Sequence, residues 1–271
     1  MGLLSSGSPA PNMALQQGRR PVGSGHITVA SAARARPTSS SRDQLLPVLP
    51  ALAPLFPRGG LQRGGVVTVG TGDGGTTLGW ALLAAVSAAS WCAAVGLADP
   101  GMVACAGLGV DLSHLVLVPR PGPSWAQVAA TLFDGMDVVL LRPPGAVRPG
   151  VARRLAARAR ERRGVLVVLG AGGWPEGADV QLTVGAGAWQ GVEAGHGHLQ
   201  GRHLDVVASG RRAAARPVRV GLWLPDPSGQ VVAGDRDRET ERSDRERSNR
   251  EGANRKGDGA AAAGHLVPGH P

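Results

Sequence analysis

The sequence contains a single lysine, Lys256, although arginine is abundant and the formal net charge is +9. Lysine is the residue with which phosphate-binding loops reach the β- and γ-phosphates of a nucleotide. Lys256 lies in a polar stretch near the C-terminal end, far along the chain from the apolar segments. The apolar part of the chain therefore has no lysine to offer to a triphosphate.

Cysteine and long apolar runs are also scarce. Cys92 and Cys105 lie in apolar surroundings without C-x-x-C spacing, which argues against a disulfide framework and fits a reduced setting. No stretch reaches the about 18–20 apolar residues of a membrane span. The pair Arg19-Arg20 is not followed by the apolar segment of an export signal. We therefore expect a cytoplasmic protein that does not contact a membrane.

The two ends of the chain lack apolar periodicity. Residues 1–42 are basic and rich in Ser, Pro, Gly and Ala, and residues 227–271 include a run that alternates Arg with Asp and Glu. Because such compositions bury too little apolar surface to fold, both ends are predicted to be disordered. Residues 43–226 remain, enough for one domain.

The stretch GGVVTVGTGDGGTT, residues 64–77, is the most informative part of this domain. Its β-branched residues predict a buried strand, and the glycines that follow predict a tight turn into a helix. The turn fits the phosphate-loop template G-x-x-x-x-G-K-[ST] except at the lysine, where Thr76 stands. The candidate nucleotide-binding residues are Gly70, Gly72, Gly74, Gly75, Thr76 and Thr77.

Beyond the turn, apolar strands alternate with helices. Strands are predicted at 91–97, 114–118, 137–141 and 164–169, and helices at 78–89, 100–108, 124–133 and 151–163. With the first strand this makes five strands joined by helical crossovers, the pattern of a parallel α/β sheet covered on both faces. Strands at 179–184, 203–209 and 217–224 lack intervening helices and are expected to extend one edge as antiparallel strands. Upstream, prolines limit residues 43–56 to a short helical turn packed against the first strand.

The order of these segments resembles the RecA recombinase core over roughly residues 55–225. The resemblance is carried by GTGDGGTT, WCAAVGLADP, LGVDLSHLVLVPRPGPSWAQV, DVVLLRPP and GVLVVLG. The segments LPALAPLFPRGGLQRG, VRPGVARRLAARARERRGVLVVLG and ARPVRVGLWLP are similar to the actinobacterial ImuA′-like branch of RecA relatives. Members of that branch are accessory proteins of damage-inducible mutagenesis. They work with an ImuB-type Y-family polymerase homologue and an error-prone replicative-type polymerase.

The resemblance also implies which catalytic groups are missing. Thr76 stands at the phosphate-loop lysine, Arg142 at the Walker B aspartate and Gly170 at the sensor glutamine. The catalytic glutamate falls near Ala98 or Asp99, which leaves Asp99 as a weak candidate. Loss of both lysine and aspartate removes the two centres that neutralise a triphosphate. The resemblance thus implies a pseudo-ATPase without a cofactor, which binds ATP and Mg²⁺ only if the degenerate loop still holds them.

DNA contact is expected from a helix rather than from loops. The two DNA-binding loops of RecA-like recombinases are shortened here to RPPGAVRPG and AGGWPEG, which argues against cooperative filaments and strand exchange. The helix at 151–163 has one narrow apolar stripe, and its arginines are the DNA-binding candidates: Arg153, Arg154, Arg158, Arg160, Arg162 and Arg163. A solvated helix face and a GC-rich genome are the alternative explanations. Since aromatic residues make up only 3%, binding should be sequence-neutral and salt-sensitive.

Two further motifs are candidates for a metal site and for a partner-binding site. GHGHLQGRH places His196, His198 and His203 close together, but no matching Cys or carboxylate completes a zinc site, so a polar hairpin loop is favoured and no metal is expected. Trp189 is expected in a loop. Because exposed tryptophan is typical of interface hot spots, Trp189 is the partner-binding candidate, with edge packing as the alternative.

Three functions fit the sequence. The first is a non-catalytic adaptor of DNA repair in the SOS response and translesion synthesis, which binds an ImuB-type partner and DNA. The second is a weak nucleotide-dependent switch or ATPase that uses the remaining backbone of the loop. The third is a cell-division regulator built on the same core.

Overall fold

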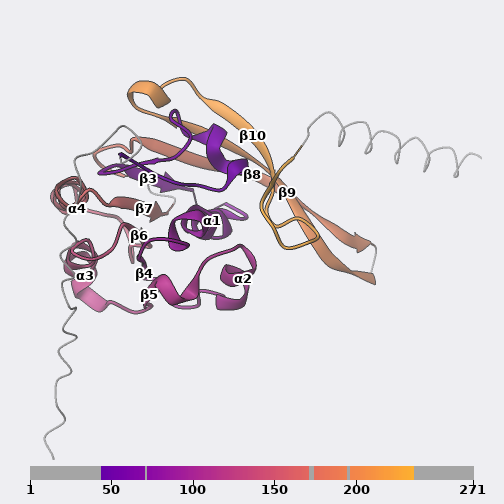
Figure 1. The fold of residues 1–271 in the computed structure, drawn as a ribbon, viewed down its shortest axis with the longest axis horizontal. Helices are drawn as coiled ribbons and strands as arrows, with labels where there is room; N and C mark the ends of the chain where they lie inside the picture. The colour runs from indigo at the N-terminus through magenta and orange to yellow at the C-terminus, as the bar shows by residue number, and fades with distance from the viewer. Residues whose placement is uncertain (1–43, 71, 171–173, 194–195, 235–271) are drawn as a thin grey trace, which may run out of the picture. The chain divides into compact units, whose positions relative to one another are not determined.

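The computed structural model describes residues 44–70, 72–170, 174–193 and 196–234 (Figure 1). Their centre is a nine-stranded sheet with the order β11-β10-β9-β8-β3-β7-β6-β4-β5. The parallel strands are β3 (Val66–Val69), β4 (Cys92–Val95), β5 (Leu115–Val118), β6 (Val138–Leu141) and β7 (Val165–Leu169). All five lie where the apolar runs predict them, which confirms the mainly parallel α/β fold.

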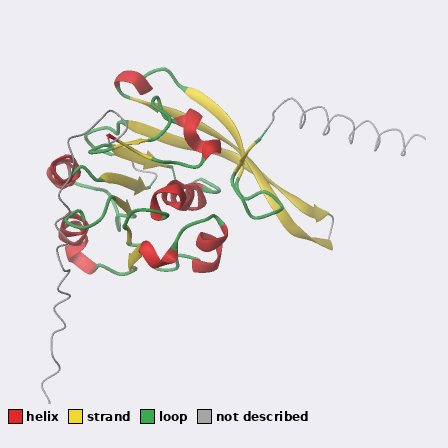
Figure 2. Ribbon diagram, viewed as in Figure 1, coloured by secondary structure: helices red, strands yellow, loops and turns green. Residues whose placement is uncertain are grey.

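Helices cover both faces of this sheet (Figure 2). The helices are α1 (Gly75–Ser87), α2 (Met102–Gly107), α3 (Trp125–Leu132) and α4 (Pro149–Arg162). The core on one face combines α1 with Cys105 of α2 and with the 3-10 helix η2 (Pro50–Leu55). The core on the other face combines α3 and α4. Because alternate strand residues enter the two cores, β3, β4, β6 and β7 are buried throughout, as their continuous apolar runs require, whereas β5 at the edge of the sheet is half-buried.

The C-terminal strands extend the sheet beyond β3. They are β8 (Val180–Glu193), β9 (His196–Gly210), β10 (Val218–Trp223) and β11 (Val232–Ala233). The first residues of β8 pair in parallel with β3, so the antiparallel pairing that the sequence predicts for this edge begins one strand later, between β8 and β9. Since β11 pairs with β10, the described sheet also continues past residue 226, the expected end of the domain.

The strands β8 and β9 form a hairpin that is much longer than predicted (Figure 1). Pairing with β3 ends at Leu182 and pairing with β10 ends at His203, so the farther part of the hairpin is a two-stranded ribbon. The prediction of a polar loop at 196–203 was wrong, because main-chain hydrogen bonds pair these glycine-rich residues although few of their side chains are buried.

Other differences are smaller. The short helical turn predicted within residues 43–56 is confirmed as η2, whose Leu52 and Leu55 are buried. The sequence did not indicate β1 (Leu45–Leu46), which pairs with β2 (Leu61–Gln62), because two-residue strands leave no periodic pattern. Short 3-10 helices lie at Leu112–His114 (η3), Gly122–Ser124 (η4) and Arg212–Ala214 (η5). The predicted disorder of residues 1–42 and of residues 235–271 concerns parts of the chain outside the described residues.

Candidate functional site: a phosphate loop with two arginines

The glycine-rich turn between β3 and α1 has the backbone of a phosphate loop. Gly74 has a φ of +101° and caps α1, and the N–H of Gly75 donates to the carbonyl of Gly72 at 2.9 Å. A Cβ on Gly75 would lie 1.9 Å from the carbonyl oxygen of Gly70, so only glycine fits there. The N-terminal end of α1 thus presents backbone N–H groups to the turn, an arrangement that favours an anion. Thr71 lies outside the described residues.

Thr76, at the lysine position, is bound by Arg142. Arg142 follows β6, the strand at whose end the resemblance places a metal-binding aspartate. Its Nη2 donates to Thr76 Oγ1 at 2.5 Å, although the two residues are 66 positions apart. The two positions at which the resemblance expects a lysine and a metal-binding aspartate are therefore in direct contact through Thr76 and Arg142.

A second arginine reaches the same loop from the hairpin. Arg202 of β9 is 7% exposed, and its Nη2 donates to Thr77 Oγ1 at 3.3 Å. Its Nε donates to the carbonyl oxygen of Leu224 at 3.3 Å, and its guanidinium lies 4.9 Å from the ring centroid of Trp189. Burial lowers the pKa of Arg202, while the charge of Asp73 acts in the opposite direction. Arginine stays protonated under such shifts, so the charge remains.

Arg202 is not among the site residues that the sequence predicts. The sequence nevertheless contains a signal for a buried side chain at this position. Arg202, Leu204 and Val206 occupy every second position of β9, and all three are buried. Only the strand assignment was missing, since this segment was expected to be a loop. Arg202 thus joins the hairpin to the loop through its contacts with Leu224, Trp189 and Thr77.

The loop does not fit a magnesium-bound triphosphate. Within the described residues, no carboxylate lies within 4.0 Å of the guanidinium of Arg142 or Arg202. Asp99 is exposed and makes no described contact with the loop, and Gly170 after β7 has no side chain. A divalent cation beside these two guanidinium groups would be repelled rather than coordinated. The arrangement suits an anion.

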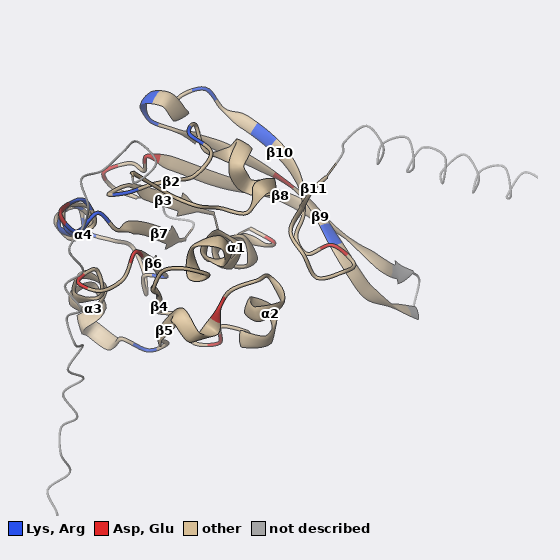
Figure 3. Cartoon of the chain, in the orientation of Figure 1, with Lys and Arg blue, Asp and Glu red and all other residues tan. Residues whose placement is uncertain are grey.

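The arginines predicted to bind DNA lie on α4 and directly after it (Figure 3). Several of them are paired with acidic residues. Arg158 and Arg162 both contact Asp134, at 2.5 and 3.1 Å, and Arg153 contacts Glu176 at 3.3 Å. Arg154 and Arg160 are exposed, and Arg163 ends the helix with a φ of +56°. The stripe predicted to face the core is broader than expected, because Ala152 and Ala156 are buried beside Leu155 and Ala159.

The tryptophan and histidine candidates lie on the hairpin. Trp189 lies in β8 rather than in a loop and is 46% exposed. The ring of His203 packs edge-on against Trp223 with centroids 5.5 Å apart, which gives this histidine a structural role. Among the described residues, no three His, Cys, Asp or Glu side chains gather into a group that could hold a metal ion. None of the described helices has both the length and the apolar composition to cross a bilayer.

Comparisons with known proteins agree with this architecture. The solved structure of the RadB recombinase aligns with 65% of this chain, and the alignment includes 94% of the RadB chain. The TM-score is 0.50 and the sequence identity 12%, which shows a likeness of fold alone. The family model described as the MT3502 N-terminal domain matches residues 54–176. The uncharacterized protein Rv3395c of Mycobacterium tuberculosis is 36% identical over 153 residues, which are 53% of this chain and 74% of that protein. The chain belongs to the family of Rv3395c, and it carries the fold of the RecA-type recombinases.

Proposed function

We propose that this protein is a non-catalytic RecA-like accessory protein of DNA repair that acts in damage-induced mutagenesis and translesion synthesis. Its partners in this proposal are an ImuB-type Y-family polymerase homologue, an error-prone replicative-type polymerase and DNA. The observation that carries the proposal is the contact between Arg142 and Thr76. A RecA-type core is kept, whereas the two positions that handle the triphosphate bind each other.

The contact between Arg142 and Thr76 opposes catalysis. Phosphoryl transfer needs a metal ion that bridges the β- and γ-phosphates and a carboxylate that holds the ion. In this proposal Arg142 stands in place of that carboxylate, and the guanidinium of Arg142 donates to the hydroxyl of Thr76. A core without turnover is suited to hold partners in place.

The test of the missing activity is phosphate release from ATP and Mg²⁺ by the purified full chain. We expect no release above the protein-free blank, for the chain itself and for Thr77→Ala. Release that Thr77→Ala abolishes would overturn the non-catalytic assignment in favour of the nucleotide-dependent ATPase. The double variant Thr76→Lys with Arg142→Asp restores both lost charges and serves as the comparison for regained nucleotide binding.

The test of the partner is co-purification with the ImuB-type homologue from the same genome. Trp189→Ala should weaken the complex by about tenfold or more, because exposed tryptophans contribute strongly at interfaces. Trp91→Ala is a matched control, since Trp91 is 43% exposed and lies away from the hairpin, against His114. Equal loss in both variants, or no complex at all, would contradict the proposed interface. Capture of cell-division proteins in its place would favour the regulator.

A further inference from the structure

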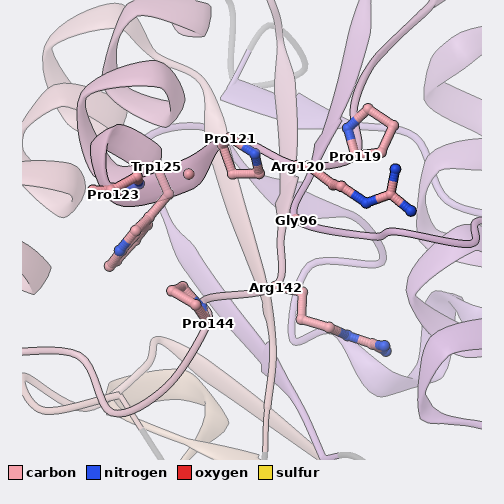
Figure 4. A pocket seen from close by; sticks show the side chains of 9 residues that line it. Gly96, Pro119, Arg120, Pro121, Pro123, Trp125, Arg142 and Pro144 are labelled. Atoms are coloured by element: carbon pink, nitrogen blue, oxygen red, sulfur yellow. The ribbon is translucent and has the colours of Figure 1, made fainter.

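A pocket lies beside the phosphate loop, where three parallel strands end (Figure 4). Gly96 follows β4, Arg120 follows β5 and Arg142 follows β6, and all three line the pocket. Its volume is about 430 Å³, within the range of small-molecule sites. Crevices at the carboxyl ends of parallel strands are the usual binding position in open α/β sheets. The described residues of the phosphate loop do not line this pocket, whereas Arg142 lines it and also contacts Thr76.

One end of the pocket is positively charged. The side chains of Arg120 and Arg142 extend to the same side of it (Figure 4). Arg120 is exposed, and among the described residues neither arginine has a carboxylate within 4.0 Å. The Nε of Arg142 is buried and has no hydrogen-bond partner in the described part of the chain. A buried donor without an acceptor is costly, so this end of the pocket is built for an anion with oxygen acceptors.

The other end is apolar and rigid. Trp125, at the start of α3, is half-buried and packs against the core, and its side chain lies across Gly96 from the two arginines (Figure 4). Pro123 and Pro144 stand beside it. Prolines fix the backbone, so little order has to be gained when a ligand binds. Gly96 between the two ends has a φ of +81° and leaves the floor without a side chain.

We propose that this pocket binds a nucleoside phosphate, with the phosphate on Arg120 and Arg142 and the base against Trp125. An indole offers a stacking surface that accepts any base, and two guanidinium groups offer a phosphate more donors than one cation would. The phosphate can belong to a free nucleotide or to a unit of single-stranded nucleic acid. The proposal does not depend on the partner or on the arginines of α4.

The experiment measures fluorescence anisotropy of a labelled oligothymidylate of about ten nucleotides at about 50 mM salt, with EDTA present. Arg120→Ala and Trp125→Ala should each lower the affinity of the full chain by about tenfold. Arg219→Ala is the matched control, because Arg219 is an exposed arginine of β10 outside the pocket and its loss removes the same charge. It should change the affinity by less than about twofold. Circular dichroism verifies that each variant is folded.

Competition then distinguishes the two sources of the ligand. Displacement of the oligonucleotide by thymidine monophosphate indicates a free nucleotide, whereas resistance to it indicates a strand. Either result supports the pocket if Arg120→Ala and Trp125→Ala weaken binding. Equal binding by all variants, no binding by the wild type, or competition by inorganic phosphate as strong as by the nucleotide would overturn the proposal. Loss only in a variant with Arg153, Arg154 and Arg160 changed to Ala would overturn the pocket and leave the proposed function standing.

Discussion

Single glycines determine the shape of the carboxyl edge of the sheet. Gly96 turns the chain directly after β4 with a φ of +81°, and a Cβ there would lie 2.1 Å from the carbonyl oxygen of Arg142. That oxygen belongs to the backbone and cannot rotate away as a flexible side chain would. Gly96 therefore allows the ends of β4 and β6 to approach closely, and with them the arginine that reaches the phosphate loop.

Gly96→Ala should lower the free energy of unfolding by about 2–4 kcal/mol, because it combines a left-handed backbone with a collision against main-chain atoms. Gly107→Ala is the control, since Gly107 ends α2 with nothing within 4 Å of its added Cβ. That change should leave stability unaltered or raise it by up to about 1 kcal/mol. Urea denaturation followed by circular dichroism measures both. Equal effects would show that the edge relaxes around the new methyl group.

The two cysteines show what burial does to a titratable group. Burial raises the pKa of Cys92 to about 12 and that of Cys105 to about 11. In the unfolded chain both pKa values return to the usual range near 8.5. A pKa raised by folding stabilises the protein fully below the unfolded value, and the contribution is lost as the pH rises toward the folded value.

Stability should therefore fall between about pH 9 and 11, by up to about 1.4 kcal/mol per pH unit for each thiol that ionises only when unfolded. Urea denaturation at several pH values measures this slope, and Cys92→Ala should make it shallower. Thiol labelling gives a second readout, because the native thiols should react slowly near pH 8 and rapidly in denaturant. Fast labelling of the folded protein would contradict the burial of both side chains.

At the scale of elements, α3 and α4 share a layer and also an ion pair network. Asp134, just after α3, contacts both Arg158 and Arg162 of α4. Because these residues are partly exposed, their contribution to stability is small and is screened by salt. Their larger effect is on charge, since Asp134 neutralises arginines that would otherwise add to the basic surface of α4.

Asp134→Asn should therefore strengthen binding to single-stranded DNA by about two- to threefold at low salt, with a steeper dependence on salt concentration. Asp134→Glu retains the negative charge and is the control. Anisotropy titrations at several salt concentrations provide both the affinity and the slope. Unchanged binding in Asp134→Asn would mean that α4 does not contact nucleic acid and that its arginines form a solvated face.

At the scale of the whole molecule, the core and the far part of the β8–β9 hairpin have different roles. The two cores draw on every parallel strand, whereas the described side chains of residues 191–200 lie outside both of them. The hairpin base is different, because Arg202 and Leu204 are buried there and Arg202 touches the phosphate loop. The described side chains of the far part of the ribbon thus lie outside the core, while its base belongs to the site.

Replacing residues 191–200 by an Asn-Gly turn should leave the fold intact and change the free energy of unfolding by less than about 1 kcal/mol, because this dipeptide suits a two-residue hairpin. Circular dichroism and urea denaturation test this expectation. The same variant should lose binding to the polymerase homologue if the ribbon carries the interface. Global unfolding of the variant would show that the ribbon is part of the folding unit.

Much of this architecture followed from local pattern. Continuous apolar runs predict buried strands, glycine clusters predict the turn before α1, and prolines limit residues 43–56 to a short helical turn, so the parallel sheet could be derived. The assignment of Thr76 and Arg142 to the lysine and aspartate positions came from the family resemblance. The two-stranded ribbon could not be predicted from the sequence. A strand with glycine at many positions and few buried side chains lacks the apolar alternation by which strands are recognised.

The sequence by itself determined a RecA-type core with Thr76 and Arg142 at the positions where the resemblance expects a lysine and a metal-binding aspartate. Only the tertiary structure decided which side chains contact the loop. Arg142 meets Thr76 across 66 residues because the parallel strands place their carboxyl ends along one edge, and Arg202 meets Thr77 across 125 residues because β9 returns beside the loop. Contacts of this kind depend on strand order and hairpin register, which no local pattern contains.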